Sequence, residues 1–462
     1  MPAIITKDFR IQNANQFSES FGESADTYYL AIGRPQAFAD NQAFNDGTDT
    51  SPPTPVDSVG SVDYYVYDDL LSAKKITSSN VSAVIPRRNW TTGTTYDYYR
   101  HDYGEINSAG NTITANSGAT TLHDATFYVM NSTFDVYKVI DNNGDSASTV
   151  EPTGNKSTSV FSTGDSYKWK YMYSLSASEQ ANFLSTDFMH VSTESTDYST
   201  TAGAIENAKV TAGGSGGSNG TYTNVDIRGD GSSGKATVVV GSNAVTSVTI
   251  TTAGSGYTYA SVLASDIGNV SGADIDFIIS PPGGHASDAV AELGGFFVMM
   301  NVDFATSESG EFNTSNDFRR IALLRNPTDS TTGSTATAST LDATKSMTFS
   351  GTPGSFQADE KITQASTGAV GFVVDFNSTT KVLRYIQPQF TNQGVDSNGN
   401  LTAFSSTNTV TGATSSATGT PSSHDITPEL TADTGDILYI ENRKPISRAS
   451  DQTENVKLIV EF

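Results

Sequence analysis

The end of the chain reads as a strand, a proline-bent turn and a second strand, spanning residues 438–462. Apolar side chains alternate along its second half at Val456, Leu458, Val460 and Phe462. A spacing of two places them on one face of an extended segment. Pro445 has no amide hydrogen for a neighbouring strand, so the chain must turn or follow a sheet edge there. This pattern predicts β structure.

Aromatic and turn-forming residues extend that prediction to the whole chain. The 462 residues include 23 Phe, 20 Tyr and 40 Gly, whereas hydrophobic residues make up 36% and charged residues 16%. Aromatic side chains favour strands and argue against disorder throughout. The length corresponds to about three domains of ~150 residues. We therefore expect a mainly all-β, multi-domain protein, with a β-sandwich-like core, a few short helices and two small inserted β-domains.

The charge of the chain restricts its partners. Fifty acidic residues against 26 basic ones give a formal net charge of −24. Such a field repels phosphate backbones and anionic membranes, so we expect no nucleic-acid partner. No apolar run reaches the ~18 residues of a membrane span, and no apolar signal core begins the chain, so we expect synthesis in a cytoplasm without membrane insertion. The chain contains no cysteine, which excludes disulfides and thiolate zinc sites.

Two short helices should interrupt the strands. Asn13 is placed to cap a helix whose apolar face includes Phe17 and Phe21. Ser176 and Glu179 form a capping-box pattern that leads into a second helix. The strand-like runs of this part are residues 28–32, 62–67, 125–130, 136–140 and 167–175.

Two segments shift in composition to Gly, Ser, Thr and Ala, and we interpret them as inserts at 201–285 and 328–425. In the first, a glycine-rich run at 212–222 recurs in shortened form at 253–257. A small sandwich or meander is expected there, with strands at 224–227, 236–240, 244–251 and 261–263.

The second insert repeats itself at a constant offset of 48 residues. The matched pairs are Phe356 and Phe404, Ile362 and Val410, Ala365 and Ala413, Ala369 and Ala417, and Gly371 and Gly419. One unit of this size has little core, so the repeat predicts two copies of one β-unit packed on each other.

Motifs that resemble catalytic sites lack the structure that such sites need. Residues 229–236 nearly match a phosphate-binding loop, but a β-branched, strand-like run follows where a helix is required. Residues 213–217 match the G-x-S-x-G sequence of a nucleophile elbow, but their flanks are glycine and serine instead of the strand and helix that the elbow joins. The five histidines form no metal-binding pattern, and the loop 396–400 lacks the glycine and distal glutamate of a calcium site. We expect no catalytic residues, no cofactor and no metal.

Six segments in order along the chain resemble the baseplate wedge subunit, the gene product eight family, of T-even-like contractile phage tails. They are Ala31–Pro35, Pro52–Val59, Ile85–Trp90, Gly164–Tyr171, Phe318–Pro327 and the end of the chain from Leu438. The chain looks like a marine cyanophage-type member. On this resemblance the core comprises residues 1–200, 286–327 and 426–462, and the two inserts depart from the shorter T-even pattern.

The resemblance implies a structural, non-enzymatic role in the tail baseplate of the virion. It implies a homodimer that contacts other wedge subunits and transmits the conformational switch of the baseplate. The candidate structural or interface residues are Arg34, Arg87, Arg88, Trp90, Arg319, Arg443, Asp451 and Gln452. For Arg87 and Arg88 we expect ion pairs with carboxylates such as Glu441 or Asp451, with Trp90 packed beside them.

Two other functions remain open. The Tyr- and Asn-rich inserts could present aromatic platforms to sugars, as in a carbohydrate- or receptor-binding tail protein. A tail-associated glycan hydrolase needs only two carboxylates in a cleft, and their spacing is set by the fold rather than by the sequence pattern.

Overall fold

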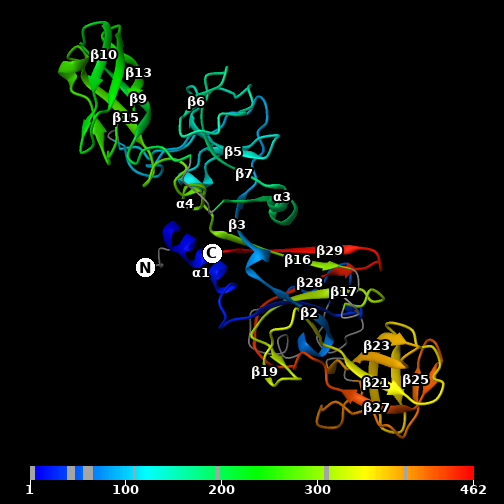
Figure 1. Cartoon of the computed structure of the whole chain (residues 1–462). Coiled ribbons are helices and arrows are strands. Elements are labelled where there is room, and N and C mark those ends of the chain that lie inside the picture. Colours follow the sequence, from blue (N-terminus) through cyan, green and yellow to red (C-terminus); the bar gives the residue numbers. More distant parts are fainter. Residues whose placement is uncertain are drawn as a thin grey trace. The chain divides into compact units, whose positions relative to one another are not determined.

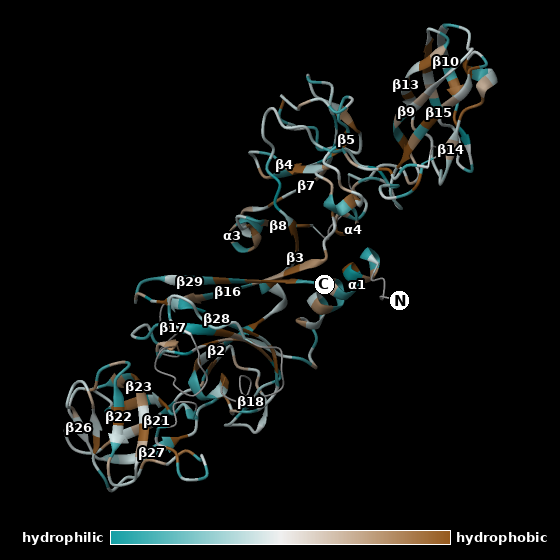
Figure 2. Ribbon diagram, turned by 180° about the vertical axis from the view of Figure 1, so that it is seen from behind, coloured by the Kyte–Doolittle hydropathy of each residue, from teal (hydrophilic) through white to brown (hydrophobic). Residues whose placement is uncertain are grey.

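The computed structural model describes residues 6–38, 47–55, 66–107, 110–192, 198–305, 312–389 and 393–462. The chain divides into two compact units. Unit 1 comprises Met1–Gln16, Ser82–Met299 and Ile459–Phe462, and unit 2 comprises Phe17–Val81 and Met300–Leu458. Antiparallel strands dominate both, so the prediction of a mainly all-β protein is confirmed. Figures 1 and 2 show the elements of each unit, with apolar residues gathered along many of the strands.

The helices are few and short, as expected. The first predicted helix exists as α1 (Lys7–Ser20), but it begins earlier than Asn13, which lies within it. The second prediction is confirmed in α3 (Ala177–Phe183), where Ser176 and Glu179 form the capping box. The other helical segments among the described residues include α4 (Ala289–Leu293) and the 3-10 turns η2 (Tyr67–Asp69), η3 (Ser78–Asn80), η4 (Leu122–Asp124) and η5 (Ala264–Ile267).

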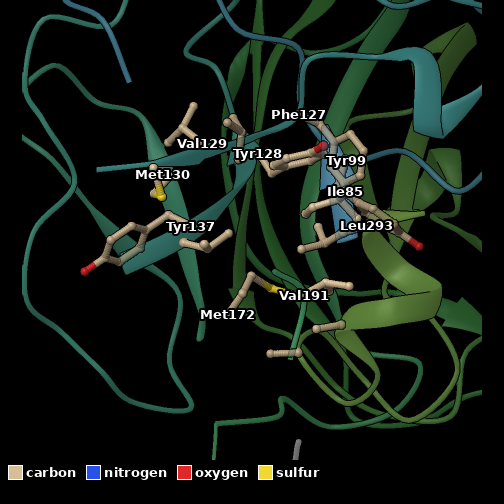
Figure 3. Close-up of a cluster of buried hydrophobic side chains, with 14 of the residues drawn as sticks. Ile85, Tyr99, Phe127, Tyr128, Val129, Met130, Tyr137, Met172, Val191 and Leu293 are labelled. Atoms are coloured by element: carbon tan, nitrogen blue, oxygen red, sulfur yellow. The ribbon is translucent and has the colours of Figure 1, made fainter. Parts of the chain in front are cut away.

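An aromatic core fills the first part of unit 1. Its sheet has the order β4-β5-β7-β6, formed by β4 (Tyr128–Met130), β5 (Asp135–Asp141), β7 (Lys168–Ser174) and β6 (Phe161–Ser162). The strands expected at 136–140 and 167–175 are confirmed. The one expected at 125–130 starts later, after η4. The fully buried ring of Trp169 stacks on Tyr167 with centroids 5.4 Å apart. Figure 3 shows the neighbouring apolar side chains, among them Tyr137 and Met172.

The segment interpreted as the first insert lies within unit 1 and has its own apolar core. Strands β9 (Ile205–Ser215) and β15 (Ser271–Ile279) pair antiparallel. A second sheet has the order β10-β12-β13, and its central strand β12 (Lys235–Gly241) buries every second residue, as period-two patterning requires. The other strands of unit 1 are β10 (Gly220–Asp226), β11 (Arg228–Gly229), β13 (Ala244–Thr252), β14 (Ala260–Ser261) and β8 (Phe188–His190), which pairs with β3 (Val81–Pro86).

The main sheet of unit 2 has the order β20-β2-β1-β17-β28. Its strands are β20 (Thr340–Asp342), β2 (Leu70–Ile76), β1 (Tyr28–Gly33), β17 (Phe318–Arg325) and β28 (Asp436–Ile446). The prediction at 28–32 is confirmed by β1, whereas residues 62–65 of the strand expected at 62–67 lie outside the described part and Tyr67 begins η2. Pro445 does not end its strand. It lies within β28, an edge strand of the sheet, which is the second of the two outcomes that its chemistry allows.

The second insert segment closes into a small barrel within unit 2. Its sheet has the order β26-β25-β22-β23-β24-β21-β27, and only Thr420 separates β26 from β27, so one nearly continuous stretch closes the sheet (Figure 1). Barrel closure removes exposed strand edges. The strands are β21 (Lys345–Phe349), β22 (Lys361–Gln364), β23 (Ala369–Asn377), β24 (Val382–Ile386), β25 (Val410–Gly412), β26 (Thr418–Gly419) and β27 (Pro421–Ile426).

The 48-residue repeat is visible in the register of this barrel. In the first copy Ile362 lies opposite Gly371, and in the second copy Val410 lies opposite Gly419. The two hairpins join where Thr363 pairs with its own repeat equivalent, Thr411. The copies therefore share one sheet about a local two-fold axis, instead of packing face to face. The remaining strands of the described ranges are β16 (Phe297–Ala305), β18 (Thr328–Asp329), β19 (Ser334–Thr335) and β29 (Thr453–Glu461).

Candidate functional site: buried arginine anchors

Two adjacent arginines on β17 anchor unit 2. Because successive side chains of a strand leave opposite faces, Arg319 and Arg320 reach different partners. The Nη1 atom of Arg320 lies 2.9 Å from each carboxylate oxygen of Asp69, which is completely buried. The Nε and Nη2 atoms of Arg319 each lie 2.9 Å from one oxygen of Asp49 in a two-pronged contact, and its Nη1 donates to the carbonyl of Pro35. These contacts join segments more than 250 residues apart in sequence.

Arg34 lies in the same cluster. Its backbone has φ +58°, and its side chain is 2% exposed. The guanidinium donates to the Ala37 carbonyl at 3.2 Å, stands 3.8 Å from the Asp69 carboxylate and faces the ring of Phe38. Burial raises the pKa of Asp69, and the charges of Arg320 and Arg34 oppose that shift. The hydrogen bonds from Arg319 lower the pKa of Asp49.

Arg87, Arg88 and Trp90 bind partners other than the ones we expected. Arg87 donates to the Asn89 side chain and to the Ser185 carbonyl at 2.8 Å. Arg88 donates to main-chain carbonyl oxygens and lies over the Tyr128 ring at 4.6 Å. The prediction of carboxylate partners for these arginines is therefore wrong, because the loop supplies carbonyl oxygens and an aromatic face to them. The Nε1 atom of Trp90 donates to the Ser148 hydroxyl at 3.1 Å.

The other three candidates lie near the turn between β28 and β29. Arg443 is about half exposed, and its Nε stands 3.5 Å from the carboxylate of Glu441. Asp451 and Gln452 are exposed in the turn, where the Gln452 amide donates to the Ala449 carbonyl. These residues do not belong to the buried cluster around Asp69. Their exposure leaves them available to a partner molecule.

Several buried charges were missed in the sequence. Arg448 pairs with Glu454 and donates to the carbonyls of Phe304 and Phe312. In unit 1, Arg100 contacts Asp102 and Asp276 at 2.7 and 2.8 Å. Arg100 and Asp276 are 176 residues apart in sequence, so no local spacing could reveal that pair.

A buried ion pair also ties β5 to α4 in unit 1. Lys138 is fully buried beside the carboxylate of Glu292, which accepts further bonds from the Ala286 and Asp288 amides. The ammonium lies 4.7 Å from the Tyr99 ring centroid. Burial lowers the pKa of Lys138, although the carboxylate opposes that shift.

The motifs that resembled catalytic loops lie in strands and turns, since residues 213–217 begin within strand β9. Residues 229–236 lead into strand β12, and the Asp230 carboxylate accepts bonds from the Thr258 amide and hydroxyl at 2.9 and 2.6 Å. Gly231 has no room for a side chain, since an added Cβ would lie 2.5 Å from the Tyr257 ring. Within the described residues, no three His, Asp or Glu side chains converge in a way that could hold a metal ion.

Comparisons with known proteins give one family. The family model described as Bacteriophage T4, Gp8 matches residues 3–147 and 389–462. The baseplate wedge protein gp8 of Enterobacteria phage T4 is 33% identical over 91 residues, which cover 19% of this chain and 26% of the T4 protein. The chain thus matches about a quarter of the length of that relative. All the candidate residues except Arg319 lie within the segments matched by the family model.

Proposed function

We propose, from the membership of this chain in the phage Gp8 family, that it is a structural subunit of the baseplate wedge in a contractile phage tail. The observation that carries the proposal is the family match over 3–147 and 389–462. The arginine anchors support it, because their guanidinium groups bind carboxylates and carbonyls of the chain itself. A cyanophage source stays a prediction.

The proposal includes a homodimer that contacts neighbouring wedge subunits and moves with the baseplate as it changes state. Rigid parts support such a role, since close-packed elements transmit displacement rather than absorb it. Arg320 and Asp69 fix β17 to η2, and the second insert segment is a closed barrel. The half-exposed Arg443 and the exposed Asp451 and Gln452 are the proposed contact residues on β28 and the turn that follows it.

The charge of −24 constrains the neighbouring subunits. We propose that they present basic surfaces, so that association weakens as salt rises. No helix in the described ranges is long and apolar enough to cross a lipid bilayer. The proposed location is the tail baseplate of the virion, and it rests on the family match alone.

Two measurements test the proposal. Protein analysis of purified tails should find the chain in a fixed ratio to other baseplate proteins, and its absence from particles would refute a structural role. Light scattering of the purified chain should give twice the 48.7 kDa mass of one copy, and a monomer at all concentrations would refute the dimer. Substrate turnover abolished by one Asp or Glu substitution would overturn the proposal that the chain is not an enzyme.

A second candidate function, sugar binding, is favoured by one observation. Unit 1 contains a hydroxyl-lined cleft with a carboxylate and an ammonium group on its walls.

A further inference from the structure

A polar cleft in the described part of unit 1 lies between β6, β9 and β13. It has a volume of about 670 Å³, within the range typical of ligand sites. Seven of its thirteen lining residues are Ser or Thr. Hydroxyl groups both donate and accept hydrogen bonds, so this wall suits a ligand that does the same.

The side chain of Glu206 lines the cleft because successive residues of strand β9 point to opposite faces. Its neighbours on β9 point the other way: Ile205 is fully buried, and Asn207 is buried with its amide donating to the Ile140 carbonyl. The Oε2 atom of Glu206 is buried and has no hydrogen-bond partner among the residues that the structure describes. Burial raises the pKa of Glu206 to about 6, against the opposing charges of Lys170, Lys138 and Lys168. The side chain is therefore a carboxyl group that lacks hydrogen-bond donors.

Lys168 supplies the opposite charge to the same cleft. It begins β7, where alternation buries the next residue, Trp169, and leaves the lysine about one-third exposed. Its Nζ lies 3.1 Å from Asp141, which holds it in place. An anionic ligand would be repelled by Glu206, and a cationic ligand would be repelled by Lys168. A neutral ligand with hydroxyl groups avoids both penalties, because it donates to the carboxylate and accepts from the ammonium.

Phe161 adds an apolar surface to this polar wall. It lies on β6, is partly exposed and meets the Tyr137 ring edge to face at 5.9 Å. The contact with Tyr137 holds the Phe161 ring in place and leaves part of the ring exposed to the cleft. Sugars combine an apolar C–H face with hydroxyls at the rim, and they suit an aromatic face flanked by polar groups.

We propose that this cleft binds a neutral saccharide, with Phe161 against the sugar ring and Glu206 and Lys168 bonded to its hydroxyl groups. The site is distinct from the arginine anchors and does not depend on the wedge role. A glycan-binding subunit would bring a cell-surface or particle-surface sugar to the baseplate. Failure of the sugar test would leave the structural proposal intact, and absence of the chain from tails would leave the cleft intact.

The test uses the full chain on an array of neutral oligosaccharides, with sialylated and sulfated glycans for comparison. The best neutral glycan is then titrated by calorimetry. Glu206→Gln and Phe161→Ala should each weaken binding about tenfold. The first substitution removes a charged hydrogen-bond acceptor, and the second removes the aromatic surface. Matched controls are Glu105→Gln, an exposed carboxylate of the same unit, and Tyr259→Ala, an exposed aromatic ring, and both should bind as the unchanged chain does.

The variants first need melting curves within a few degrees of the unchanged chain, and Phe161→Leu replaces Phe161→Ala if the latter fails to fold. No binding by any neutral glycan at ~10 mM would overturn the proposal, as would preference for charged glycans. Loss of binding in Tyr259→Ala alone would place the sugar elsewhere and refute the cleft. A lysine-rich peptide that binds through Glu206 while no glycan binds would replace the sugar with a basic protein segment.

Discussion

The pair of Arg320 and Asp69 offers a sharp test of the anchoring role. Asp69→Asn keeps the shape of the side chain and one acceptor oxygen, but it removes the negative charge opposite a guanidinium that is 9% exposed. Breaking one partner of a buried ion pair leaves an uncompensated charge, which costs about 3–5 kcal/mol. In this unit of about 220 residues, such a loss lowers the melting temperature by roughly 10 °C.

The same strand provides the control. Arg325 on β17 pairs with Asp436 at 2.7 Å, but both side chains are well exposed, at 40% and 57%. Asp436→Asn should therefore cost less than about 1 kcal/mol. Hydrogen exchange of peptides from β1 and β17 measures both variants. Equal, small losses for Asp69→Asn and Asp436→Asn would refute the argument that burial makes the first pair an anchor.

Three further predictions concern other sites. Burial lowers the pKa of His123 to about 4, so its neutral form stabilises unit 1 above pH 6.5 and that contribution is lost as pH falls toward 4. His123→Gln should make urea stability less pH-dependent over this window by about 3 kcal/mol, and parallel profiles would contradict this. Gly419→Ala should cost about 1–3 kcal/mol in a urea titration, because the new Cβ would lie 2.7 Å from the Phe349 ring, whereas Gly371→Ala, with contacts no closer than 3.1 Å, should cost less. Sugar affinity of the Glu206 cleft should fall in calorimetry as pH drops below about 6, and a flat profile would count against an ionised acceptor.

Local patterns in the sequence predicted the type of many elements. Strand-like runs predicted β5, β7 and β12, and the Ser176–Glu179 pattern predicted α3, because each signal acts over a few residues. The start of α1 was misplaced, since Asn13 is compatible with a helix interior as well as with a cap.

Residues that contact each other only in the folded chain could not be predicted from such local patterns. Asp69 and Arg320 are separated by 251 residues, and no spacing rule connects them. Arg88 was assigned a carboxylate on the basis of charge alone, although a planar guanidinium also binds carbonyls and aromatic faces. The sugar cleft depends on three segments that meet only in the folded chain.

In the barrel, a sequence difference between the two copies of the repeat creates hydrogen bonds that join one copy to the other. The Glu360 carboxylate of the first copy accepts bonds from the Thr414 and Ser415 amides of the second, at 3.0 and 2.9 Å. Its repeat equivalent is Asn408, whose shorter side chain bonds within its own turn. The Glu360 side chain of the first copy therefore stabilises the backbone of the second copy, whereas the Asn408 side chain stabilises its own copy. Gly412 adds to this asymmetry, since a Cβ there would lie 2.6 Å from the Glu360 carboxylate.

One-way support predicts that the barrel unfolds as a single cooperative unit. Glu360→Ala removes a charged acceptor for two part-buried amides of the second copy, and losing hydrogen bonds to a charged group costs about 1.5–3 kcal/mol. Because β22 and β25 are neighbours in one closed sheet, hydrogen exchange should speed up equally in both copies. Asn408→Ala, the matched change in the second copy, should have a smaller effect. If Glu360→Ala speeds exchange only around Thr414 and Ser415, the copies open separately and the closed barrel is not one cooperative unit.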